Sequence, residues 1–352
     1  MRTLLSTLLI AVPVTLILTL VGLTQGLLED SQQRARGIGA DVWVRPSGTS
    51  FGTSLSGAPI SEKFVEFFET QPHVTMAIGT VVQATEGVLV GVTGVDLDKF
   101  TQMSGGLQFL EGGLPREPND IIVDQYYAAQ KKLRVGSELP LFNRRWRVSG
   151  IFTGGKLARI ILPIRTLQEL TSSSGKVTQI FVKLDDAQNT DAAISEFKMK
   201  APDLQYYSMA DLSSLYSVNS YAGLPEFINV IVGLGVVIGF FVVCLSMYMA
   251  VLQRTREIGI LKSLGATNGF IVRVILLEGL LLGVGGTIVG IGFSFGSWWL
   301  IRTLVPASLQ MVIVMEWWPI AGAITLLGAG LGALYPGLNA ARHDPIEALA
   351  YE

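Results

Sequence analysis

Long uncharged hydrophobic runs occupy both ends of this chain. They are Thr3–Leu28, Phe227–Leu252, Gly279–Ile301 and Trp317–Ala341. Each is long enough to cross a hydrocarbon core about 30 Å thick, which takes roughly 20 helical residues. Helices buried in soluble proteins rarely reach this length without a charged residue. The pattern therefore predicts four transmembrane helices rather than four buried helices of a soluble protein.

The first run follows a basic residue, so a secretory signal peptide is an alternative interpretation. However, the run is longer than the hydrophobic region of a usual signal peptide. Its exit reads GLTQGLLED and contains no A-x-A cleavage pattern. We therefore interpret residues 1–28 as a retained anchor, transmembrane helix 1.

Nearly 200 residues of ordinary globular composition separate the first run from the second. Alternating or β-rich stretches predict strands, whereas apolar residues at helical spacing predict helices. The predicted strands are ADVWVRPSG, VTMAIGTVVQAT, EGVLVGVTGVD and VTQIFVKLDD, with a hairpin in GSELPLFNRRWRVSGIFTG. The predicted helices are SEKFVEFFETQP, which Ser61 would cap, and TDAAISEFKMKAP, while NDIIVDQYYAAQKKL predicts a strand running into a helix. Residues 29–225 thus read as an α+β domain inserted between helices 1 and 2.

Two further segments of this domain carry their own predictions. The run at 48–59, GTSFGTSLSGAP, has the composition of a flexible loop. The segment 210–226 is compatible with a helix that extends the second membrane span outward. Pro225 would then permit a kink near the interface.

The distribution of Lys and Arg predicts the orientation of the membrane helices. The loop between the second and third runs carries four basic residues, whereas the loop between the third and fourth carries only Arg302. The first loop should therefore be cytoplasmic, both termini cytoplasmic, and the α+β domain extracytoplasmic. An aromatic belt of Trp298, Trp299, Trp317 and Trp318 flanks the outer loop. The expected segments are helix 2 at 226–252, a cytoplasmic segment at 253–270, helix 3 at 271–301, an external loop at 302–316, helix 4 at 317–338 and a cytoplasmic tail at 339–352.

Composition agrees with a membrane protein and argues against several classes of function. The 352 residues are 49% hydrophobic and 15% charged, whereas a soluble domain carries about a quarter of charged residues. The single cysteine, Cys244, can form no disulfide within the chain. The only histidines, His73 and His343, are far apart in sequence, so a metal site is poorly supported. The net charge of −2 gives no case for nucleic-acid binding.

Enzyme motifs are also missing from the sequence. The nearest approach to a nucleotide-binding loop, SSSGKVT, has Val177 where Ser or Thr is required and Leu170 where the first Gly is required. No H-E-x-x-H, G-x-S-x-G or C-x-x-C occurs. The neighbouring acids Asp185 and Asp186 are more typical of a solvated turn than of a catalytic pair. We therefore expect this chain to have no catalytic residues and to bind no metal or cofactor.

The segment from Gln253 to Asn268, QRTREIGILKSLGATN, is the most informative part of the chain. Helical projection places Ile258, Leu261 and Leu264 on adjoining faces, with basic residues around the remainder. One interpretation is a loop that only sets topology, and the other is a helix that docks into a groove of a partner protein. Gly265 suits a C-terminal helix cap. A rigid capped helix loses less entropy on docking than a loop, which favours docking.

Glycines in the third membrane span are regularly spaced. Each of the pairs Gly279–Gly283, Gly286–Gly290 and Gly292–Gly296 has the i, i+4 spacing that lets helices approach closely. Glycine is also generally commoner in membrane helices. We favour specific helix packing, either within one chain or between two.

Glu278 lies in the cytoplasmic half of the third span, five residues after Arg273. A charge there is costly unless it is paired, which makes it a functional candidate. Proton coupling is one interpretation. We favour the other, in which Glu278 is a cap or a hydrogen-bond partner within snorkelling reach of the cytoplasmic interface.

Two segments near the end of the chain resemble those of a known family. RTREIGILKSLGAT, at 254–267, resembles the signature of the FtsX/MacB-type permease family of ABC transporters, and so does the tail AARHDPIEALAYE. The plan of one span, a large outer domain and three further spans is the family plan. GGLPREPNDIIVDQYYAAQKKLRVGSEL and WRVSGIF resemble the family's MacB-like periplasmic core domain. Among members, the chain looks closest to DevC-like permeases.

The resemblance implies a permease subunit of an ATP-driven exporter in the bacterial inner membrane. The subunit would pair with a second permease copy, as a homodimer or heterodimer, and bind cytoplasmic ATPase subunits that hold ATP and Mg. A periplasmic adaptor protein is a candidate partner, and membrane lipid surrounds the spans. Residues 254–267 would be the coupling helix that passes ATP-driven motion to the outer domain for efflux or extrusion of cargo. The expected ATPase-coupling residues are Arg254, Arg256, Glu257, Ile258, Gly259, Leu261, Lys262, Leu264, Gly265 and Ala266.

Alternatives remain open at the level of sequence. An FtsX-like signalling subunit would use the same motion to activate an external enzyme and would transport nothing. A membrane enzyme with its site in the outer domain is disfavoured because no nucleophile–base motif is present. Family members usually carry a short amphipathic cytoplasmic helix before the first span. Here the first span is expected to begin almost at Met1.

Overall fold

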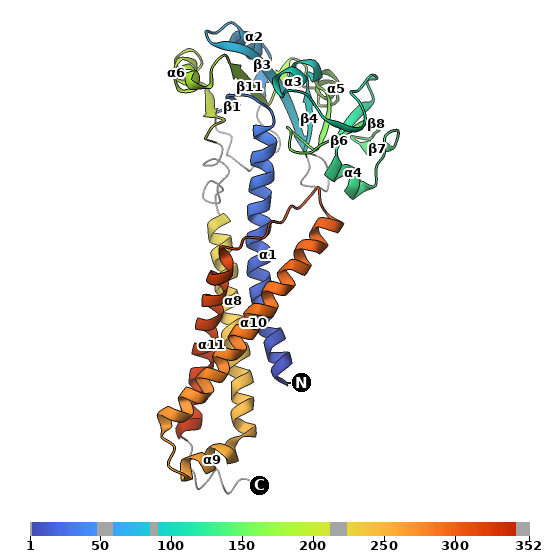
Figure 1. Cartoon of the computed structure of the whole chain (residues 1–352). Coiled ribbons are helices and arrows are strands. Elements are labelled where there is room, and N and C mark those ends of the chain that lie inside the picture. The colour runs from blue at the N-terminus through green and yellow to red at the C-terminus, as the bar shows by residue number, and fades with distance from the viewer. Residues whose placement is uncertain (1, 48–58, 85–90, 212–223, 343–352) are drawn as a thin grey trace. The chain divides into compact units, whose positions relative to one another are not determined.

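In the computed structural model, residues 2–47, 59–84, 91–211 and 224–342 are described (Figure 1). The chain divides into two compact units. The helical unit comprises Met1–Gln25, Gly223–Leu300 and Met311–Glu352. The sheet unit comprises Gly26–Ala222 together with Ile301–Gln310.

Four helices among the described residues are long and apolar enough to cross a membrane. They are α1 (Arg2–Arg36), α8 (Leu224–Gln253), α10 (Asn268–Leu304) and α11 (Trp317–Arg342). The short helix α9 (Thr255–Ser263) joins α8 to α10 (Figure 1). The predicted fold class is confirmed, with an α+β domain between the first and second long helices. Both α1 and α10 continue past the expected spans, to Arg36 and Leu304 respectively.

Glycines let α10 pack closely against its neighbours in the helical unit. A methyl group added at Gly286 would lie 2.4 Å from Cγ2 of Ile10 on α1, and one at Gly290 would lie 2.6 Å from Cβ of Val14. These separations are too short for a side chain, so the two helices approach through glycine. The Thr15 hydroxyl also donates to the Gly290 carbonyl, at 3.1 Å.

The same helix meets α11 through a second pair of glycines. Methyl groups at Gly279 and Gly283 would lie 2.6 and 3.1 Å from the Cβ atoms of Ala333 and Ala329. Methyl groups at Gly292 and Gly296 would meet nothing within 4 Å. Four of the six spaced glycines therefore pack within one chain.

The sheet unit is built on a ten-stranded mixed sheet with the order β12-β1-β11-β3-β4-β9-β6-β8-β5, and β7 pairs with β8. The β4–β9 and β6–β8 pairs are parallel and the others antiparallel. Its strands are β1 (Val42–Pro46), β3 (Val74–Ala84), β4 (Gly91–Val95), β5 (Phe109–Gly112), β6 (Asp120–Asp124), β7 (Glu138–Leu141), β8 (Arg144–Phe152), β9 (Ile160–Pro163), β11 (Gln179–Leu184) and β12 (Leu204–Ser208). The strands β2 (Ile60–Ser61) and β10 (Lys176–Val177) form a separate pair.

Both faces of this sheet are covered. Side chains alternate along a strand, so Val42 and Val44 of β1 enter one hydrophobic cluster while Trp43 enters another. The first cluster also contains Phe68 of α2 and Phe197 of α6. The helices of the unit are α2 (Lys63–Glu69), α3 (Leu97–Met103), α4 (Gln125–Lys131), α5 (Ile164–Leu170) and α6 (Thr190–Lys200), with a 3-10 turn η1 (Ala187–Asn189).

One local prediction is wrong and two fall largely outside the described residues. Ser61 does not cap α2, because it pairs with Lys176 in the β2–β10 ladder. Glu62 takes the cap position and makes no side-chain cap bond. The expected loop at 48–59 and the expected outward helix at 210–226 lie mostly in residues 48–58 and 212–223, which are not described.

Candidate functional site

The helix α9 is short, and its end is defined by Gly265. Gly265 adopts a left-handed backbone with φ of +95°. Its N–H donates to the Lys262 carbonyl, and the N–H of Ala266 donates to the Leu261 carbonyl, both at 3.0 Å. These two bonds form a Schellman motif, which satisfies carbonyls that the helix end leaves free. The cap expected from the sequence is therefore present.

The apolar side chains of α9 are divided between two surroundings. Ile258 is half-buried and packs against the hydrophobic cluster of the helical unit, and Gly259 is buried. By contrast, Leu264 is 80% exposed, and Ile260 and Leu261 are each 44% exposed. We call these three exposed residues the apolar ridge of α9. The sequence grouped Ile258 with Leu264, but the structure packs Ile258 within the helical unit and leaves Leu264 exposed.

Glu278 of α10 forms an ion pair with Arg254, the residue that precedes α9. Arg254 Nη1 lies 3.4 Å from Oε1 of Glu278, and the two side chains are 57% and 38% exposed. The same guanidinium nitrogen reaches the second carboxylate oxygen, also at 3.4 Å. The sequence predicted that the charge of Glu278 would need a partner. The structure supplies Arg254, which belongs to the segment expected to contact the ATPase.

The other end of α9 is attached to α11. Lys262 Nζ donates to the carbonyl of Ala341, in the last turn of α11, at 2.8 Å. A cation there neutralises the negative end of the helix dipole and satisfies a terminal carbonyl. Glu257 is exposed in the first turn of α9, where an acid is favourable. Arg256 belongs to α9, but its side chain lies outside the described part of the structure.

In the sheet unit, the end of α1 is attached by a buried ion-pair network. Arg159 is 6% exposed and donates to Asp30 of α1 at 2.9 Å and to Asp124 at 2.7 Å. Arg34 also pairs with Asp30, and the Arg159 guanidinium lies over the Tyr126 ring, 5.4 Å from its centroid. Burial raises the pKa of the Asp124 carboxyl above its ordinary value of 3.8, and Arg159 opposes that shift.

Sequence reasoning missed this network. Asp30 and Arg159 are 129 residues apart, and Arg159 and Asp124 are 35 apart. The only local signal was that acids follow directly after the first hydrophobic run.

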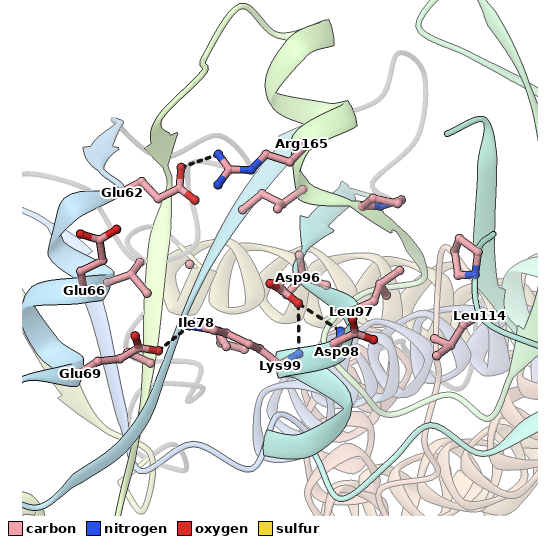
Figure 2. Close-up of a pocket in the computed structure, with 17 residues that line it drawn as sticks. Glu62, Glu66, Glu69, Ile78, Asp96, Leu97, Asp98, Lys99, Leu114 and Arg165 are labelled. Carbon is pink, nitrogen blue, oxygen red and sulfur yellow. Dashed lines mark hydrogen bonds and ion pairs between the residues drawn. The ribbon is translucent and has the colours of Figure 1, made fainter. Parts of the chain in front are cut away.

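A hollow of about 500 Å³ lies on the sheet unit between α2 and α3 (Figure 2). Charged side chains line it, but most are engaged. Lys99 pairs with Glu69 at 2.6 Å and Arg165 with Glu62 at 3.0 Å. Asp96 caps α3 by accepting from the backbone N–H groups of its first turn. Most of these groups therefore stabilise the domain itself.

Among the described residues, no group of three or more His, Cys, Asp and Glu side chains is arranged to hold a metal ion. A capped helix with an exposed apolar ridge is attached at both ends to membrane helices.

Comparison with known proteins identifies the family. Residues 229–345 match the model of the FtsX-like permease C-terminal domain, and residues 3–199 match the MacB-like periplasmic core domain. A Bacillus subtilis protein described as an uncharacterized ABC transporter permease, YknZ, is 40% identical over 132 residues, which are 37% of this chain and 32% of that protein. The macrolide export ATP-binding/permease protein MacB of Vibrio parahaemolyticus is 26% identical and covers 99% of this chain and 58% of its own length.

A solved structure also matches part of the chain. The periplasmic region of MacB from Actinobacillus actinomycetemcomitans aligns with a TM-score of 0.39 and 16% identity, over 51% of this chain and 94% of that one. The chain spans less than two thirds of the length of the curated relatives it matches. The two family models together cover most of the chain and match both of its parts. This chain is therefore a multi-pass membrane protein that belongs to the FtsX/MacB-like permease family of ABC transporters.

Proposed function

We propose that this chain is the permease subunit of an ATP-driven exporter and that α9 docks into a cytoplasmic ATPase subunit. The observation that carries the proposal is the apolar ridge of Ile260, Leu261 and Leu264 on a capped helix. Exposed apolar side chains on a helix suit insertion into a groove of a partner. The segment 253–270 is then the coupling segment and faces the cytoplasm together with both termini.

The proposal includes a division of labour between this chain and an ATPase partner. The MacB proteins are named ATP-binding/permease proteins, and this chain spans 58% of the Vibrio protein. This chain carries no nucleotide-binding loop. In our proposal a separate subunit holds ATP and Mg and hydrolyses the nucleotide, and this chain is not catalytic. Two permease copies and two ATPase subunits would assemble, with a periplasmic adaptor as a further partner.

The contacts of α9 with α10 and α11 provide a path by which motion of the ATPase could reach the membrane helices. A groove that closes on the ridge would pull on Arg254 and Lys262, which are tied to α10 and α11. Both helices belong to the membrane-spanning set, so the motion would be passed outward and drive efflux of cargo. The MacB relatives are named as export proteins, which favours export over a signalling role.

The experiment is a purification of the tagged chain in detergent or nanodiscs, with ATP hydrolysis assayed in the eluate. Leu264→Asp should reduce the recovered ATPase activity at least about tenfold, because burying a leucine contributes roughly 1.5–3 kcal/mol. Met199→Asp is the matched control, since Met199 is 78% exposed on α6 of the sheet unit. Unchanged ATPase recovery with Leu264→Asp would refute docking through the ridge.

Ile258→Asp is a less suitable test variant. Ile258 packs against the cluster that contains Val251 and Ile271. Its replacement by an acid would disturb the helical unit itself. A loss of ATPase in that variant would therefore not distinguish docking from misfolding.

A further inference from the structure

The short helix α4 makes specific contacts at both of its ends, and each end meets a different segment of the sheet unit. At its start, the Asp124 carboxylate accepts the backbone N–H of Tyr127 at 2.7 Å and so caps the helix. The same carboxylate accepts from Arg159, whose other nitrogen donates to Asp30 of α1. The buried guanidinium of Arg159 therefore connects the start of α4 to α1.

The far end of α4 is joined through Gln130 to the segment 301–310, which contains the last turn of α10 and the start of the loop that follows it. Its Oε1 accepts the backbone N–H groups of Ala307 at 2.8 Å and of Ser308 at 3.2 Å. Its Nε2 donates to the Ser308 hydroxyl at 3.0 Å. A glutamine amide suits this position because it offers both an acceptor and a donor.

The hydrogen bond from Ala307 to Gln130 forms in a buried part of the domain. Ala307 is 3% exposed and belongs to the hydrophobic cluster on one face of the sheet. A buried backbone N–H without a partner is costly. Gln130 supplies the partner, so the loop depends on this side chain for its place in the domain.

The helix α4 contacts segments that lie next to the points where the chain passes from one unit to the other. The chain passes between the two units at 25/26, 222/223, 300/301 and 310/311. The first passage is within α1 and the third is within α10. The last two passages bound the segment 301–310, which Gln130 contacts. The passage at 222/223 lies outside the described residues. The three described passages therefore all lead to segments tied to α4.

We propose that α4 links the outer end of α1 to the loop between α10 and α11, with Gln130 as the positioning residue. A displacement of Asp30 reaches Ala307 and Ser308 through Arg159, Asp124 and the helix, and a displacement of the loop reaches α1 by the same route. This link is separate from the docking of α9, and its test needs no ATPase. Failure of one proposal is therefore distinguishable from failure of the other.

The test is amide hydrogen exchange of the full chain in lipid nanodiscs. In Gln130→Ala, the amide of Ala307 should exchange about tenfold faster, because its acceptor is lost. The amide of Ser308 should change less, because it also donates to the Val305 carbonyl at 3.2 Å. Gln130→Glu keeps an acceptor oxygen and should restore slow exchange. Gln125→Ala is the matched control, since Gln125 lies on the same helix and no hydrogen bond joins it to residues 301–310.

The link itself is tested from the α1 side. Asp30→Asn should speed exchange at the Ala307 amide about threefold, although no hydrogen bond joins Asp30 to residues 301–310. Asp30→Glu, which keeps the charge, should not. The coupling must also act in reverse. Gln130→Ala should therefore speed exchange at the N–H of Leu157, which donates to the Arg34 carbonyl on α1 at 3.0 Å.

Three results would overturn the proposal. Loop exchange in Gln130→Ala equal to that of the unmodified chain would remove the role of Gln130. Equal effects of Gln125→Ala and Gln130→Ala would indicate general destabilisation of α4. Faster exchange at Ala307 in Gln130→Ala, without any change at Leu157, would show that Gln130 supports only its own surroundings. In that case α4 does not link the loop to α1.

Discussion

Glu278 of α10 and Arg254 at the start of α9 form an ion pair with a nitrogen–oxygen distance of 3.4 Å. The two residues are 24 positions apart, on either side of the segment proposed to meet the ATPase. The pair joins the proposed docking helix to a membrane-spanning helix. It also accounts for a carboxylate at the edge of an apolar span without invoking proton transport.

The ion pair leads to a charge-exchange prediction. Glu278→Arg places two cations together and should lower the ATPase activity of the purified complex two- to fivefold, in line with the roughly 0.2–1 kcal/mol of an exposed pair. Arg254→Glu should have a similar effect. The double variant Glu278→Arg with Arg254→Glu restores opposite charges and should recover activity. If the double variant is as impaired as the sum of the single variants, the pair does not hold α9.

A second prediction concerns the cap of α9. Gly265 has a φ of +95°, which a residue with a Cβ adopts at a cost. Gly265→Ala should loosen the Schellman motif by roughly 1 kcal/mol, whereas Gly265→Asn should be milder because Asn tolerates a left-handed backbone. Hydrogen exchange at the Ala266 amide measures this directly. Equal protection in the Ala and Gly forms would show that the cap is not strained.

Helix packing provides a third prediction. A methyl group at Gly286 would lie 2.4 Å from Cγ2 of Ile10, so Gly286→Ala should destabilise the helical unit by about 1–3 kcal/mol. Gly292→Ala is the matched control on the same helix, because a methyl group there meets nothing within 4 Å. Thermal unfolding in a fixed detergent reports the difference. A similar midpoint for both variants would contradict the close approach of α1 and α10.

The fourth prediction is a pH dependence in the sheet unit. Asp120 accepts two hydrogen bonds from Arg147, at 2.8 and 3.1 Å. The bond from Arg147 holds the pKa of Asp120 below its ordinary value of 3.8. Because the folded-state pKa is lowered, the carboxylate stabilises the fold above pH 3.8, and that stability is lost as the pH falls through the folded-state pKa.

Asp120→Asn should therefore lower the melting temperature of the domain at pH 7, and the difference should shrink near pH 3. The expected loss at neutral pH is about 1.5–3 kcal/mol, as for hydrogen bonds to charged groups. Asp203→Asn serves as the control, because Asp203 is exposed and its side chain makes no hydrogen bond among the described residues. A difference that stays constant from pH 7 to pH 3 would show that the Asp120 charge is not the cause.

The sequence by itself determined the features that depend on near neighbours in the chain. Four hydrophobic runs required four long helices, because the free energy of burying apolar residues in lipid depends on composition over about 20 residues. Alternation and helical spacing identified the α+β character of the inserted domain. The end of α9 was also readable, since a left-handed cap is a property of Gly265 and its two neighbours.

Only the tertiary structure decided which side of each amphipathic face is covered and by what. Periodicity grouped Ile258 with Leu264, but packing buries the first within the helical unit and leaves the second 80% exposed. The sequence also did not indicate that Glu278 pairs with Arg254, 24 residues away, or Asp30 with Arg159, 129 residues away. The physical reason is that local patterns fix the free energy of exposing a side chain to water, whereas its partner depends on which distant segments the fold brings together.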